Sequence, residues 1–176
     1  ELRSQAAILT STTSTYTAGF IHPVSPRWQL GLDYRQVNIT GTGASGTWLA
    51  LPGTGTTQVY SGQALGSSLM RANDSFTANA SAISGAQITG QNYSLAYMIP
   101  VNDWRFDALV GYYYQTDSQN QRQTLLSPTA RVVYQLRKRL TLELSAGSNI
   151  LDESGPLQQQ HYRRYFTYGG YRWDFN

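Results

Sequence analysis

The feature that most constrains this chain is an alternation of apolar and polar residues with a period of two. It is clearest in three segments, which begin at Trp28, Trp104 and Leu140. Successive side chains of a β-strand point to opposite sides, so each segment predicts a strand with one apolar and one polar face. The apolar set, expected to face lipid, is Trp28, Leu30, Leu32, Tyr34, Trp104, Phe106, Val110, Leu140, Leu142 and Leu144.

Segment length separates two architectures that share this alternation, a soluble sandwich and a membrane barrel. Sandwich strands usually run about 5–6 residues, whereas these segments run about ten, the length that a tilted strand needs to cross a bilayer. Short connections are expected at 22–27, 71–74, 100–103 and 137–139, and longer ones at 41–57, 116–123 and 149–160. Short turns at one end and long loops at the other are typical of outer-membrane barrels.

The expected strand number raises a question of parity. We expect nine strands, at residues 7–22, 27–40, 58–70, 75–84, 88–99, 103–116, 123–136, 140–150 and 160–175. A complete bacterial barrel normally has an even number. Either residues 3–9 supply a tenth, or upstream strands complete the barrel, and we favour the second. Residues 1–176 are then a single domain, the C-terminal portion of a longer transmembrane antiparallel β-barrel.

Composition excludes several other classes. Charged residues make up 13% of the chain and Lys138 is its one lysine, which argues against a helical bundle, whose surface is rich in Lys and Glu. No apolar run approaches the ~18 residues of a membrane helix. The absence of cysteine rules out disulfides and thiolate metal sites. A net charge of +3 without a basic cluster gives no reason to expect a nucleic-acid partner.

The C-terminal segment carries the most specific motif. Residues 168–175 read YGGYRWDF, which resembles the C-terminal signal of bacterial outer-membrane proteins. Gly170, Trp173 and Phe175 match that pattern, Tyr168 stands where a polar residue is usual, and Asn176 extends one residue beyond the usual terminal aromatic. The resemblance implies the barrel-assembly machinery as a partner during biogenesis. Large barrels of exopolysaccharide exporters are a plausible parent family, although the chain has no motif specific to them.

Charged residues of the opposite parity are the best candidates for a functional site. Because an ion is costly against lipid, these charges are expected to line the barrel interior. They are Asp33, Arg35, Arg105, Asp107, Arg131, Glu143, Arg172 and Asp174. In a wide barrel they would line a wet channel, whereas in a barrel of eight to ten strands they would form a filled salt-bridge core.

Other motifs carry little chemistry. Residues 41–46 fit G-x-G-x-x-G, but a dinucleotide site needs a helix to follow, and Pro52 leaves no room for one. His22 and His161 are the only histidines, and neither has a serine and an orienting group that the sequence can place beside it. We therefore expect no enzyme activity, no cofactor and no metal site.

The sequence thus predicts a protein of a Gram-negative-type outer membrane. Its expected function is a porin-like or export channel for a polar solute, conceivably a polysaccharide. The expected partners are outer-membrane lipid, lipopolysaccharide (through Arg163 or Arg164) and periplasmic secretion components. One alternative is a small closed barrel that acts as an anchor or adhesin through its outer loops, and another is a soluble all-β binding module.

Overall fold

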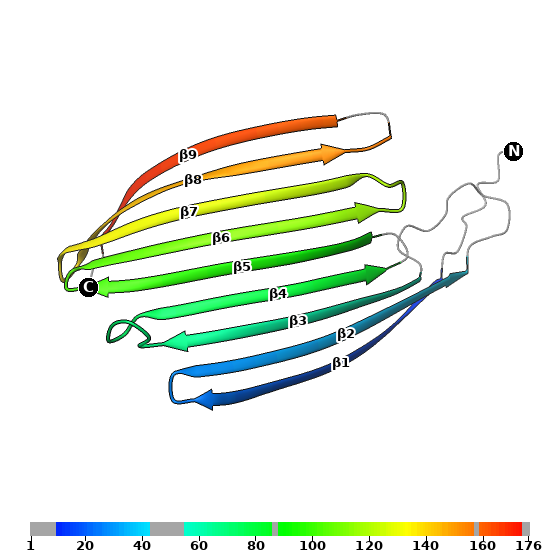
Figure 1. The fold of residues 1–176 in the computed structure, drawn as a ribbon, viewed down its shortest axis with the longest axis horizontal. Helices are drawn as coiled ribbons and strands as arrows, with labels where there is room; N and C mark the ends of the chain where they lie inside the picture. Colours follow the sequence, from blue (N-terminus) through cyan, green and yellow to red (C-terminus); the bar gives the residue numbers. More distant parts are fainter. Residues whose placement is uncertain (1–9, 43–54, 86–87, 157–158, 174–176) are drawn as a thin grey trace, which may run out of the picture.

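One sheet of nine strands makes up the fold. The computed structural model describes residues 10–42, 55–85, 88–156 and 159–173. The strands follow chain order across the sheet, each antiparallel to the next (Figure 1). They are β1 (Thr10–Ser25), β2 (Trp28–Thr42), β3 (Gly55–Ser67), β4 (Ser75–Gly85), β5 (Ile88–Val101), β6 (Trp104–Asp117), β7 (Arg122–Arg137), β8 (Leu140–Ser154) and β9 (Gln159–Trp173). The predicted all-β antiparallel class is confirmed.

Strands β1 and β9 form the two edges of this sheet. They lie on opposite sides of it in Figure 1 and do not pair with each other among the described residues, so the nine strands form an open sheet. Every neighbouring pair is antiparallel, and eight such pairings separate the edges. Strands β1 and β9 therefore run in the same direction. None of the described residues forms a helix long and apolar enough to span a membrane.

The strand ends define two ends of the sheet. At the turn end, residues 26–27, 68–74, 102–103 and 138–139 connect consecutive strands, and the other connections lie at the loop end. Two predicted long loops are shorter than expected: only 118–121 separate β6 from β7, and only 155–158 separate β8 from β9. The polar residues that suggested loops continue the strands instead, because backbone pairing does not require apolar side chains. The predicted loop at 41–57 lies mostly outside the described residues.

Strand β1 continues beyond the point at which a turn was expected. The turn was predicted from His22 onward because of Pro23, but β1 pairs with β2 as far as Ser25, with a register shift between Pro23 and Ser25. Proline lacks a backbone N–H and is tolerated on edge strands and at bulges. The register shift beside Pro23 is such an irregularity, and it lets β1 accommodate the proline.

Candidate functional site

The strand register assigns each described strand residue to one of two faces. Directly paired residues of an antiparallel sheet project to the same side. Leu32 of β2 thus shares a side with Phe20 of β1 and Gly62 of β3, and the pairing carries this side through to β9. All ten residues of the predicted apolar set lie on this side, here called the apolar face. The opposite side is called the polar face.

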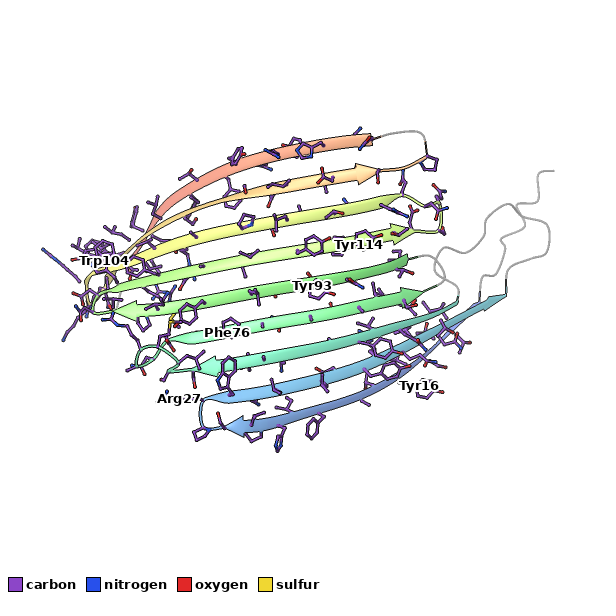
Figure 2. All side chains as sticks on the ribbon, in the orientation of Figure 1. Tyr16, Arg27, Phe76, Tyr93, Trp104 and Tyr114 are labelled. Atoms are coloured by element: carbon purple, nitrogen blue, oxygen red, sulfur yellow. The ribbon has the colours of Figure 1, made fainter. Side chains whose placement is uncertain are left out.

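Aromatic rings gather toward both ends of the apolar face. In Figure 2, Trp104 and Phe76 lie toward the turn end, and Tyr114 and Tyr16 toward the loop end. Ring-centre distances are 5.7 Å for Trp28–Phe76 and 4.4 Å for Trp104–Tyr134 at the turn end, and 5.0 Å for Tyr34–Tyr60 and 6.2 Å for Tyr93–Tyr112 at the loop end. Trp104 and Tyr114 are ten residues apart on β6, about 34 Å along a strand and about 25 Å in height at a tilt of ~40°.

The tyrosine hydroxyls near the loop end point along their strands toward that end. Each of three tyrosines donates a hydrogen bond to the glutamine two residues nearer the loop end: Tyr34 to Gln36 at 2.7 Å, Tyr60 to Gln58 at 3.3 Å and Tyr93 to Gln91 at 3.1 Å. The apolar face therefore changes to hydrogen-bonding groups beyond these rings. Tyrosine is enriched at membrane–water boundaries because one end of its side chain is apolar and the other polar.

The large hydrophobic side chains of the apolar face are exposed or only partly buried. No large hydrophobic side chain among the described residues is buried, and Leu32 is 63% exposed. The accessible surface of the chain is 13429 Å², against roughly 8,600 Å² expected for a compact soluble protein of this mass. Burying a Leu or Phe side chain contributes roughly 1.5–3 kcal/mol, and the described sheet leaves most of that stabilisation unused. The apolar face therefore needs an apolar environment that the sheet itself does not provide.

A network of ion pairs crosses three strands of the polar face near the turn end. Asp107 of β6 accepts hydrogen bonds from Arg131 of β7, with Oδ2 at 2.6 Å from Nη2 and 2.7 Å from Nε. Arg105 approaches the same oxygen at 3.3 Å, and Nη1 of Arg131 lies 3.7 Å from Oε1 of Glu143 on β8. Within the described residues, Nε of Arg105 and Oδ1 of Asp107 have no hydrogen-bond partner although both are screened from solvent. The network thus keeps some unused hydrogen-bonding capacity.

Two more of the predicted interior charges, Asp33 and Arg35, lie on the polar face at a distance from the network. Asp33 and Arg35 lie on β2, where the carboxylate of Asp33 covers Gly19 of β1. Neither forms an ion pair with another described residue. Arg172 of β9 pairs with Thr141 in the register, and Asp174 lies outside the described residues. The structure therefore brings together Arg105, Asp107, Arg131 and Glu143, and keeps Asp33 and Arg35 apart from them.

Two aromatic side chains of the polar face lie over glycines. Phe166 of β9 is opposite Gly147 of β8, and a Cβ added to Gly147 would come within 2.6 Å of the phenylalanine ring. Tyr168 lies against Gly170 of its own strand, where an added Cβ would be 2.6 Å from the hydroxyl oxygen. The glycines give these rings room to lie flat along the sheet.

The residues that resemble a C-terminal assembly signal divide between the two faces. Tyr168 and Gly170 lie on the polar face and Trp173 on the apolar face, through their pairing with β8. Phe175 lies outside the described residues.

Sequence reasoning missed one buried group, Asp74, in the turn between β3 and β4. Asp74 is 1% exposed and accepts hydrogen bonds from the backbone amides of residues 69, 70 and 71 and from the hydroxyl of Tyr97. Burial alone would raise the pKa of Asp74, but these four hydrogen bonds hold the pKa well below its ordinary value. Ser68 and Asn73 adopt left-handed backbone conformations, with φ of 53° and 66°. The available signal was an aspartate at the last position of the turn, directly before β4.

The histidines form no recognisable catalytic or metal site. His161 Nδ1 contacts Asp152 Oδ1, and His161 Nε2 accepts a hydrogen bond from Arg163 Nε at 3.0 Å, so both ring nitrogens are engaged. His22 stacks on Phe20. Among the described residues no group of three or more His, Cys, Asp or Glu side chains is placed to hold a metal ion. The G-x-G-x-x-G motif at 41–46 lies almost entirely outside the described residues.

Comparison with known proteins gives no match to a family model, to a curated protein or to a solved structure. The two faces of the sheet, and the side chains that each face presents, are therefore the features from which a function can be inferred.

Proposed function

We propose that this chain is part of an outer-membrane β-barrel whose polar face lines a water-filled passage for a polar solute. The observation that supports it most is the exposed apolar face, bounded by aromatic rings about 25 Å apart in height, which matches the lipid-facing band of such barrels. A lipid bilayer is the environment that such a face requires. The C-terminal motif that resembles an assembly signal supports the same location, with the barrel-assembly machinery and lipopolysaccharide as partners.

The open edges support a barrel larger than nine strands. Unpaired backbone groups cannot remain exposed to lipid, because each one costs several kcal/mol. Strands β1 and β9 run in the same direction, so direct closure would create a parallel pair. An odd number of further strands between them gives an even total with antiparallel pairing throughout, and we propose that additional strands of the barrel fill this gap.

The ion-pair network supports a passage that distinguishes solutes by charge. In a barrel with clearly more than ten strands, the polar face is too large to be filled by its own side chains. Arg105, Asp107, Arg131 and Glu143 then lie along a water-filled interior, where fixed charges govern which ions pass. Such an interior admits polar solutes. These include extended polysaccharides, which periplasmic secretion components would supply.

Conductance of the full-length protein in planar bilayers tests this function. We expect stable ion-conducting channels, and we expect Arg131→Gln to lower the ratio of anion to cation permeability because it removes a fixed positive charge from the passage. Arg137→Gln is the matched control, since Arg137 lies at the turn end of the same strand, outside the network. Insertion of the protein without conductance would contradict the proposal and favour a closed barrel that acts as an anchor.

A further inference from the structure

A row of four polar side chains crosses the loop end of the polar face. Gln115 of β6 pairs with Gln123 of β7, Gln123 pairs with Glu153 of β8, and Glu153 pairs with Gln160 of β9. These four residues, here called the amide row, line a hollow of about 120 Å³ together with Asp117. Four adjacent strands span about 14 Å, so the amide row is an extended, shallow surface.

A second row, parallel to the first, presents apolar groups. Tyr113, Leu125, Leu151 and Tyr162 are direct partners across the same four strands. Each lies two residues from a member of the amide row, about 7 Å nearer the middle of the sheet. Tyr162 is 55% exposed, so a ring is accessible beside the polar groups.

The amide row has hydrogen-bonding capacity that the described residues do not use. Gln123 Nε2 donates to Glu153 Oε1 at 3.0 Å, whereas the side-chain amides of Gln115 and Gln160 have no partner among the described residues. Each amide offers two donors and one acceptor. Asp117 is already engaged, because its Oδ1 accepts the backbone amides of residues 119 and 121.

We propose that the two rows form a binding site for a neutral carbohydrate. Sugar hydroxyls both donate and accept hydrogen bonds, which fits amides, and the C–H faces of sugar rings are apolar, which fits Tyr162. A site with a few convergent polar groups beside an apolar surface is a usual arrangement for small ligands. Arg122 also lines the hollow, but the carboxylates of Glu153 and Asp117 leave a net negative charge there, which disfavours anionic sugars. The inference rests on the proposed passage and names the solute class that enters it.

Calorimetric titration of the full-length protein in detergent, with cellohexaose and maltohexaose as neutral probes, tests the site. We expect at least one hexasaccharide to bind, and a hexamer of galacturonate to bind more weakly. We expect Gln123→Ala and Tyr162→Ala to raise Kd about tenfold each, the loss expected for one contact. Thr124→Ala and Arg163→Ala are matched controls on the apolar face of the same strands, and each should change Kd less than twofold.

Circular dichroism of every variant identifies any change caused by loss of the fold. Absence of binding by both neutral probes, tighter binding of the uronate, or equal losses in the control variants would overturn the site. The conductance measurement tests the proposed passage separately. If the protein conducts ions but binds no carbohydrate, only the binding site is refuted. If it binds carbohydrate but does not conduct, the passage is refuted.

Discussion

The two faces of strand β8 differ in a way opposite to that of a water-soluble sheet. On the apolar face Leu142 and Leu144 are 41% and 56% exposed, whereas Glu143 and Ser145 on the polar face are partly buried. In a soluble protein the leucines would be covered and the glutamate exposed. The difference teaches that alternation alone does not say which face meets water. The surroundings of each face determine that, and on β8 the side chains of the polar face are the less exposed ones.

The largest effect is expected from placing a charge on each face in turn. Leu144→Arg should destabilise the protein folded in lipid vesicles by about 2–4 kcal/mol, because the charge would face the bilayer. Ser145→Arg, one residue further on and on the polar face, should cost less than about 1 kcal/mol. Urea titration monitored by tryptophan fluorescence measures both. Equal costs for the two variants would contradict the assignment of the faces.

A methyl group added at a glycine should also distinguish the faces. At Gly147 on the polar face, a Cβ would approach the backbone oxygen of Pro128 to 2.7 Å and the ring of Phe166 to 2.6 Å. We expect Gly147→Ala to cost about 1–3 kcal/mol. At Gly169 on the apolar face, the nearest atom is Leu144 Cδ1 at 4.0 Å, so Gly169→Ala should be close to neutral. The same urea titration measures both variants. A neutral effect of Gly147→Ala would contradict the close packing of Phe166 and Pro128 against Gly147.

The ion-pair network should stabilise the polar face by a smaller amount. Asp107→Asn leaves Arg105 and Arg131 without their shared carboxylate, and we expect a loss of about 1 kcal/mol, since the arginine side chains are 43% and 41% exposed. Asp33→Asn is the matched control, because Asp33 lies on the same face and forms no ion pair with any residue that the structure describes. If both variants lose the same stability, the network contributes nothing specific.

A pH-dependent effect is expected from Asp74 in the β3–β4 turn, which belongs to neither face. Its pKa is lower in the folded chain than in an unfolded one, so its stabilising contribution is present above the ordinary pKa of about 3.9 and is lost as the pH falls toward the folded value. Asp74→Asn should lower the melting temperature at pH 7 and flatten this acid dependence. Asp103→Asn, an exposed aspartate in the β5–β6 turn, should leave both unchanged.

The period-two pattern was enough to predict the strands and to sort the residues that share a face, because side-chain direction follows directly from strand geometry. Ion-pair partners could not be predicted in the same way. Asp107 and Arg131 meet because the register of β6 and β7 joins positions 24 residues apart, and no local pattern encodes that register. Asp74 was missed for a similar reason, since its partner Tyr97 comes from β5.

Strand ends were predicted less well than the strands themselves. Polar segments near 116–123 and 149–160 resemble loops in composition, but they continue as strands beyond the aromatic rings. The expectation that further strands complete a barrel stays a prediction, because alternation within a strand carries no information about what lies beside an edge strand.

Cysteine accessibility along β8 tests the central claim most directly, because the chain has no cysteine of its own. Single cysteines are placed at each position from 141 to 146 in the full-length protein, which is reconstituted in lipid vesicles and treated with a water-soluble maleimide. The account predicts alternation, with labelling at Thr141, Glu143 and Ser145 and protection at Leu142, Leu144 and Ala146. Uniform labelling, or labelling of the leucine positions alone, would contradict it.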